Sequence, residues 1–216
     1  MSYPGNVEKI PLLIPKRLFD IIFSLLFLMI TSPLFLLLLL LIFFEHIIIG
    51  KVFAPLFYIE KRISRGEPFG FIKFNIFKPS VIASMKNKKF FIHTKVLEHD
   101  GHSLLYTGRV LQKVYLDELP QLINILKGDM SVVGPRPVNL EVYKKLLSQG
   151  IYTKTVIKAG LTGRAQALKG RSKESHVKLE TEYINYCRNN PAWKIIVYDI
   201  KIIFNTILVI IRAKGI

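Results

Sequence analysis

The sequence predicts an α+β protein that is mostly helical, with one small β-hairpin and a bent N-terminal helix that enters a membrane. Three observations lead to this expectation. Residues 21–44 form an uncharged apolar run that contains a Ser-Pro pair, residues 55–77 show a hairpin pattern, and later apolar residues recur mainly at helical spacings. We expect residues 1–50 to form a tail and the membrane helix, and residues 51–216 to form a membrane-associated cytoplasmic domain.

The composition narrows the possible partners. The chain has 216 residues, half of them hydrophobic, and a net charge of +16. Many basic soluble proteins bind nucleic acid, but a long uncharged apolar run is rare among them. We therefore expect anionic membrane lipid or phosphorylated substrates as partners, and no nucleic acid. A single cysteine, Cys187, excludes an internal disulfide and fits a reducing compartment.

The apolar run allows two membrane topologies. A helix over residues 21–44 is long enough to cross a hydrocarbon core of about 30 Å. However, Thr31-Ser32-Pro33 lies near its middle, where proline kinks a helix and Ser and Thr can satisfy the freed carbonyls. Basic residues flank both ends, which assigns both ends to the cytoplasm. We therefore favour a re-entrant helix, and a spanning helix is the alternative.

Two further segments complete the expected architecture. In residues 55–77, two aromatic and β-branched runs flank Ser64-Arg65-Gly66-Glu67-Pro68, which predicts a hairpin with a loop of several residues. Residues 193–211 are strongly apolar but are interrupted by Asp199 and Lys201. This pattern favours an amphipathic helix that lies on the membrane surface, with a buried core helix as the alternative.

The stretch YLDELPQLINILKGDMSVVGPRP, residues 115–137, contains two adjacent carboxylates, Asp117 and Glu118. Its apolar spacing predicts a helix that begins near Asp117 and ends before Gly128. Acidic residues suit a helix N-terminus, so the pair can be a simple cap. On a basic membrane protein the pair can also act chemically, because one carboxylate can attack phosphorus while the other holds Mg²⁺.

Two arginines fit the same chemistry. Arg136 lies between Pro135 and Pro137, which restrict its backbone and present its guanidinium as a fork for phosphate oxygens. Arg171 lies in the glycine-rich stretch GLTGRAQALKGRS, residues 160–172, which could approach a phosphate but lacks the spacing of a Walker loop; by itself it is a weak signal, and a basic surface loop is the usual interpretation. The carboxylate pair and Arg136 together predict a phosphoryl-transfer site.

Several stretches resemble the bacterial sugar transferases, which are monotopic phosphoglycosyl transferases that begin polysaccharide and glycan assembly. The resemblance covers nearly the whole chain and is similar to the minimal form of the family, without the extra transmembrane bundle of larger members. It is carried by KRLFDIIFSLLFLMITSPLF, PLFYIEKRISRGEPFGFIKF, GRVLQKVYLDELPQ, KGDMSVVGPRP, KAGLTGRAQALKGRS and DIKIIFNTI.

This resemblance implies a two-step reaction. An aspartate attacks the β-phosphorus of a UDP-sugar, UMP leaves, and polyprenyl phosphate then attacks the aspartyl-phosphosugar. By position, Asp117 would be the nucleophile and Glu118 the Mg²⁺ ligand, so that both are catalytic. The substrate-binding residues would be Lys73, Lys113, Arg136, Arg171 and Glu180. The enzyme would lie in the bacterial inner membrane with its catalytic domain, residues 51–216, on the cytoplasmic face, and it could form oligomers.

The sequence also departs from the family pattern. Gln112 stands where an arginine is common, Asn75 where a basic residue is usual, and Glu180 where an aspartate is expected. These departures support an alternative, a non-catalytic membrane-bound homologue that acts as a scaffold or regulator of a glycan assembly complex. A rival within enzymes is a glycosyl transferase that cleaves the anomeric C–O bond and therefore releases UDP rather than UMP.

Overall fold

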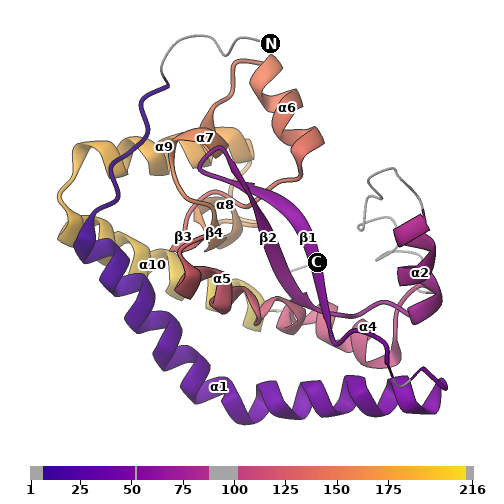
Figure 1. The fold of residues 1–216 in the computed structure, drawn as a ribbon. Coiled ribbons are helices and arrows are strands. Elements are labelled where there is room, and N and C mark those ends of the chain that lie inside the picture. Colours follow the sequence, from indigo (N-terminus) through magenta and orange to yellow (C-terminus); the bar gives the residue numbers. More distant parts are fainter. Residues whose placement is uncertain (1–6, 52, 88–101, 213–216) are drawn as a thin grey trace. The chain divides into compact units, whose positions relative to one another are not determined.

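The computed structural model is mostly helical, which confirms the predicted α+β class (Figure 1). Among the residues that it describes, the named strands form two small two-stranded sheets, β1 with β2 and β3 with β4. The described residues are 7–51, 53–87 and 102–212.

The chain divides into two compact units. The first unit contains Met1–Met29, Glu60–Phe71 and Gln121–Ile216, and the second contains Ile30–Ile59 and Ile72–Pro120. Each unit therefore includes part of the N-terminal helix and part of the hairpin. The sequence prediction divided the chain differently, into a tail with a membrane helix (residues 1–50) and a cytoplasmic domain (residues 51–216). That division describes attachment to a membrane, which the two compact units do not test, and it stays a prediction.

The N-terminal helix, α1, runs from Ile14 to Ile48 and contains Pro33 without ending there. Within the described part of the chain it is the one helix long and apolar enough to cross a membrane, by length and composition. Most of its apolar side chains are exposed, whereas Asp20 and Glu45 are buried. An exposed apolar surface on the protein is what a hydrocarbon environment would cover, while the buried carboxylates must find partners inside the fold.

The hairpin is confirmed, but its turn is shorter than predicted. β1, Phe57–Ser64, and β2, Glu67–Phe74, are joined by only Arg65 and Gly66. Both turn residues have positive φ, 52° and 82°, as a two-residue turn of the type that matches strand twist requires. The guanidinium of Arg65 donates to the carbonyl of Ile10 at 2.9 Å, which ties the turn to the segment before α1.

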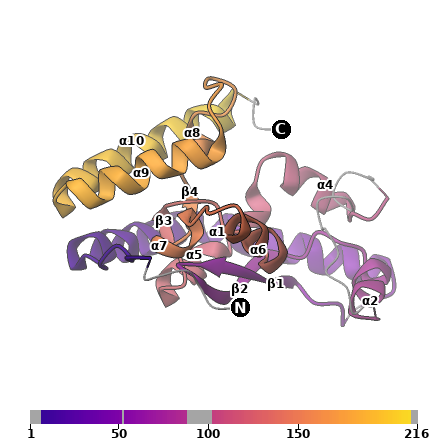
Figure 2. The same ribbon diagram turned by 90° about the horizontal axis from the view of Figure 1, so that it is seen from above.

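The first unit is built around a parallel strand pair. β3, Ser131–Val133, pairs with β4, Gly160–Thr162. Helices α9 and α10 lie side by side (Figure 2). The helices of this unit, besides the first part of α1, are α5 (Gln121–Lys127), α6 (Leu140–Ser148), α7 (Thr153–Val156), α8 (Arg164–Ala167), α9 (His176–Asn189) and α10 (Ala192–Ile211).

A buried polar cluster attaches α1 to the rest of the first unit. The ammonium of Lys16 lies 2.6 Å from Asp20 Oδ1 and 2.8 Å from Asp199 Oδ2 on α10. Asp199 also accepts a hydrogen bond from the hydroxyl of Tyr183 at 2.8 Å, and Asp20 accepts one from the amide of Val132 at 3.1 Å. These contacts join α1 to α9, α10 and β3. They also explain why Asp199 interrupts the apolar C-terminal segment, since its carboxylate is a buried partner of Lys16.

Helix α10 has two different faces. Ile195, Asp199, Ile202 and Val209 are buried within the first unit. A second apolar stripe is exposed and consists of Trp193, Val197, Ile200, Phe204 and Ile207. An exposed apolar stripe opposite a packed one is what a helix at a membrane surface presents. The predicted contact with the membrane stays a prediction.

In the second unit, α1 continues from Ile30 and is followed by α2 (Pro79–Asn87), α4 (Tyr106–Lys113) and the short 3₁₀ helix η1 (Leu116–Glu118). Glu45 near the end of α1 accepts hydrogen bonds from the amides of Tyr106 and Thr107, at 2.6 and 3.0 Å. This carboxylate satisfies amides at the N-terminus of α4, where negative charge is favourable. It thereby fixes the helix that leads into η1.

Candidate active site

The carboxylate pair lies on η1, between α4 and α5. Asp117 and Glu118 are buried, with 3% and 8% of their surface exposed. The prediction of a helix beginning near Asp117 is wrong, because α5 begins at Gln121. Tyr115 adopts a left-handed conformation with φ 57° and turns the chain after α4, so the next residues form a tight 3₁₀ turn. The predicted end of the helix at Lys127 is confirmed, with Gly128 at φ 89°.

The structure places Lys73 beside both carboxylates. Lys73 lies on β2, and its Nζ is 3.5 Å from Asp117 Oδ2 and 3.6 Å from Glu118 Oε1. All three side chains are largely removed from solvent, so their charges interact more strongly than they would in water. Lys73 thus brings one positive charge to the two adjacent carboxylates.

The donor set suits Mg²⁺. Carboxylate oxygens are the ligands that this ion prefers, and it is commonly held by one or two carboxylates while substrate phosphates and water complete the shell. Among the described residues there is no group of three or more His, Cys, Asp or Glu that could hold a metal by itself. Glu118, with or without Asp117, could supply one or two ligands of such an ion.

Arg136 lies in a tightly held turn of the first unit, directly after β3. Before it, the amide of Gly134 donates to Thr162 O at 2.9 Å, and Pro135 O accepts from the amide of Gly160 at 3.0 Å. The carbonyl of Arg136 accepts from the ammonium of Lys154 at 2.9 Å. The backbone of this arginine is therefore fixed on both sides, while the residue itself is exposed.

Glu180 is buried and is engaged by neighbouring side chains. Its Oε1 lies 2.5 Å from Lys154 Nζ, and its Oε2 accepts from the hydroxyl of Thr153 at 2.8 Å. The predicted role of Glu180 in substrate binding stays a prediction. Lys154 was not recognised from the sequence, because a single lysine between threonines belongs to no motif. Only the fold shows that it links Glu180 to the turn of Arg136.

The family model described as "Bacterial sugar transferase" matches residues 12–213. The chain belongs to this family. The sugar transferase is 32% identical to "Uncharacterized sugar transferase EpsL" of Bacillus subtilis, over 94% of this chain and 91% of that protein. It is 34% identical to "Exopolysaccharide production protein ExoY" of Sinorhizobium fredii, over 94% and 88% of the two chains. The prediction that the protein is a transferase is therefore confirmed.

The comparisons also include larger relatives. The sugar transferase is 32% identical to "Undecaprenyl-phosphate galactose phosphotransferase" of Salmonella typhimurium, over 93% of this chain but 41% of that protein. It is 35% identical to "UDP-glucose:undecaprenyl-phosphate glucose-1-phosphate transferase" of Escherichia coli, over 66% of this chain and 29% of that protein.

One departure of the sugar transferase from the expected motif has a structural explanation. Asn75 is completely buried, two residues after Lys73. Its side-chain oxygen accepts from the amide of Phe77 at 3.1 Å, and its amide group donates to the carbonyl of Pro55 at 2.8 Å. These bonds hold the chain that enters β1 against the chain that leaves β2. An arginine or lysine could not donate and accept in the same way.

The remaining predicted site residues lie at the surface. Lys113 is the last residue of α4 and is exposed, in the same unit as Lys73 and the carboxylate pair. Arg171 follows α8 and is exposed in the first unit, which also contains Arg136 and Glu180. The structure thus brings together Lys73 with the carboxylates, and Arg136 with Glu180 through Lys154.

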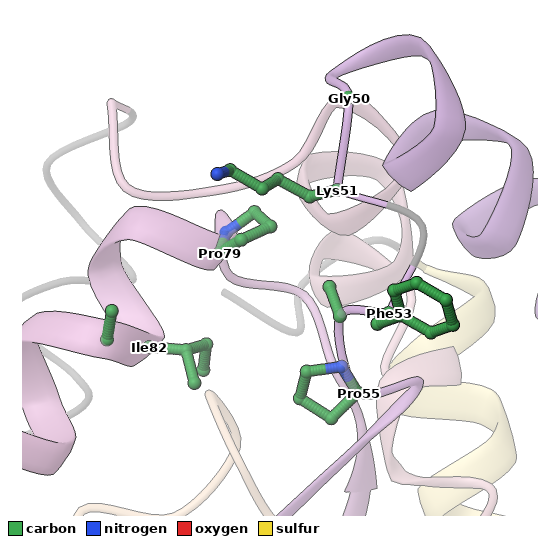
Figure 3. A pocket seen from close by; sticks show the side chains of 8 residues that line it. Gly50, Lys51, Phe53, Pro55, Pro79 and Ile82 are labelled. Atoms are coloured by element: carbon green, nitrogen blue, oxygen red, sulfur yellow. The ribbon is translucent and has the colours of Figure 1, made fainter.

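The second unit also contains a pocket of about 480 Å³ between the end of α1 and α2 (Figure 3). It is mostly apolar, with one cationic side chain, and is lined by Gly50, Lys51, Phe53, Ala54, Pro55, Pro79, Ile82 and Ala83. None of the predicted site residues is among those that line it.

Proposed function

We propose that this sugar transferase moves a phosphosugar from a UDP-sugar to polyprenyl phosphate through a covalent intermediate on Asp117, releasing UMP. The product, a polyprenyl-diphosphate-sugar, would begin glycan or polysaccharide assembly at the membrane. The names of the relatives from Salmonella typhimurium and Escherichia coli support the substrate classes. The main structural support is the buried pair Asp117 and Glu118 with Lys73 within 3.6 Å.

In the first step, a carboxylate oxygen of Asp117 forms a bond to the β-phosphorus, and the bond from that phosphorus to UMP breaks with its electron pair leaving on UMP. In the second step, an oxygen of polyprenyl phosphate attacks the same phosphorus and releases the Asp117 carboxylate. Lys73 adjoins the nucleophile and can stabilise the charge that develops on the phosphoryl oxygens. Glu118 would hold Mg²⁺, which when bound neutralises the diphosphate so that an anionic nucleophile can approach.

The leaving group tests this proposal directly. The purified protein would be incubated with Mg²⁺, polyprenyl phosphate and a panel of UDP-sugars, and UMP and UDP would be measured separately. We expect UMP from one or a few sugars, since the bond that breaks lies between the two phosphorus atoms. Release of UDP would instead indicate attack at the anomeric carbon. If neither UMP nor UDP were released from any sugar of the panel, while a related active transferase worked as the control, the result would favour the non-catalytic homologue.

We also propose that α1 is re-entrant, so that both of its ends lie on the cytoplasmic face of the inner membrane. Near its start, Lys16 and Arg17 bind partners in the first unit. Near its end, Glu45 binds α4 in the second unit. Basic residues flank both ends of the apolar run and Pro33 lies near its middle, so a bend there would return the chain to the face from which it entered.

Cysteine labelling distinguishes the two topologies. The native Cys187 is buried, and burial raises the pKa of its thiol to about 12, so it should react little. The variants Leu12→Cys and Lys51→Cys, one at each end of α1, would be treated with a membrane-impermeant maleimide. We expect both to be protected in cells with an intact inner membrane and both to react after detergent is added. Labelling of only one end in intact cells would show a spanning helix instead.

A further inference from the structure

We propose that Lys154 is a positioning residue that sets the direction of Arg136 toward the anionic groups of the nucleotide sugar. This inference rests on the proposed function, in which Arg136 binds phosphate. It assigns a role to a buried side chain that lies outside the sequence motifs. It also gives Glu180 a role, which is to hold Lys154 in place rather than to contact the substrate.

The contacts of Lys154 are few and specific. Lys154 is buried, and its ammonium binds two acceptors, the carboxylate of Glu180 and the backbone carbonyl of Arg136. The other oxygen of Glu180 is held by the hydroxyl of Thr153. Burial lowers the pKa of Lys154, and the nearby Glu180 charge acts in the opposite direction. The ammonium is therefore kept in one place by α9 on one side and by the turn on the other.

The sequence of the turn explains why a side chain is needed. Pro135 and Pro137 fix their own φ angles but have no N–H, so this turn has few backbone donors. The residue before a proline is restricted to extended conformations, yet within that range the ψ angle of Arg136 can still vary. Binding of the Arg136 carbonyl by Lys154 at 2.9 Å fixes the peptide plane that follows the arginine, and with it the ψ angle.

Stability alone is a poor explanation for this arrangement. A buried ion pair costs desolvation, and its replacement by apolar residues of similar size is often neutral for stability. Lys178, on the same helix as Glu180, offers a comparison, because it forms an exposed Lys–Glu pair with Glu174. Removal of either lysine deletes one Lys–Glu pair, but only Lys154 touches the turn of Arg136.

The test combines kinetics with a double-mutant cycle. We expect Lys154→Met to raise the KM for the UDP-sugar about tenfold with a smaller change in kcat, because ground-state binding by Arg136 is weakened. Lys154→Arg should recover part of this loss, and Lys178→Met should leave both constants unchanged. In an Arg136→Ala background, Lys154→Met should cost less than about twofold, since residues that act through one another are not additive. Equal losses in both backgrounds would overturn the inference.

A second measurement does not depend on activity. Hydrogen exchange of the peptide spanning residues 131–141 would be compared in the wild type, Lys154→Met and Lys178→Met. We expect faster exchange in this peptide for Lys154→Met and not for Lys178→Met. The unfolding temperature of Lys154→Met should fall as well, because Glu180 is left buried without its cation. The double variant Lys154→Met with Glu180→Gln removes that charge and should still show the faster exchange, at an unfolding temperature closer to that of the wild type. Unchanged exchange would overturn the positioning role even if the enzyme were active. If the wild type released no UMP, the proposed function would fail, while this comparison would still decide whether Lys154 holds the turn.

Discussion

Asp117→Asn is expected to reduce UMP release from the preferred UDP-sugar by about a thousandfold or more, because an amide is a far weaker nucleophile than a carboxylate. The substitution preserves the size of the side chain, and Lys73 keeps Glu118 at 3.6 Å as a partner, so the fold should persist. Initial rates would be measured together with mass spectrometry of the peptide that contains Asp117. The wild type should show a phosphosugar adduct on that peptide when polyprenyl phosphate is left out, and the variant should not.

Two further variants make this result specific. Glu141→Gln removes an exposed carboxylate from the first turn of α6 and should leave the rate unchanged. Glu118→Gln should lower the rate in a way that added Mg²⁺ partly restores, because a ligand rather than the nucleophile has been weakened. If Asp117→Asn retained more than a tenth of the wild-type rate and the wild type formed no adduct, polyprenyl phosphate would have to attack the UDP-sugar directly.

Gly160→Ala is expected to prevent stable folding of the first unit, with a loss of about 4 kcal/mol or more. A Cβ atom at this position would lie 2.1 Å from the amide nitrogen of Gly134 and 2.4 Å from the carbonyl oxygen of Thr162. Both atoms belong to the backbone of the paired segment, so they cannot move aside as a flexible side chain can. The methyl group would separate β3 from β4 and displace the turn that carries Arg136. Thermal unfolding and the yield of monodisperse protein in detergent would measure the loss.

Gly150→Ala is the matched control for this prediction. Gly150 has φ 73°, so alanine there is strained, but an added Cβ would have no heavy atom within 4 Å. It should therefore cost only about 1 kcal/mol. The prediction would be contradicted if Gly160→Ala and Gly150→Ala unfolded within a few degrees of each other. In that case β3 and β4 could separate without loss of stability, and the close backbone approach would not be needed.

Much of the fold could be predicted from local sequence, because local spacing determined it. The apolar run, the two strands and the end of α5 at Lys127 each follow from patterns within a short window. The start of α5 could not be predicted, because the spacing of apolar residues continues from η1 into α5 and only Leu119 and Pro120 lie between the two. The hairpin turn was predicted too long for a related reason, since Ser64 and Glu67 resemble loop residues but extend the strands.

The site was predictable where residues form a motif and unpredictable where the fold supplies the contact. Asp117, Glu118 and Lys73 each stand in a recognisable stretch, and the structure brings them together. Lys154 lies eighteen residues from Arg136 in sequence and has no pattern around it. Asn75 seemed a lost phosphate ligand, but its amide joins two backbone segments that are twenty residues apart. Such pairings depend on tertiary structure and leave no local signal.

The cluster of Lys16, Asp20 and Asp199 has a consequence for how the chain is made. Its members on α1 leave the ribosome early, whereas Asp199 is synthesised near the end of the chain. Once α1 has been made, Lys16 can already pair with Asp20 one turn away, so neither charge has to wait for a partner. The first unit cannot close until α10 arrives, because contacts between the two ends of a sequence form late. The packing of α1 in the first unit is therefore completed only when synthesis is nearly finished.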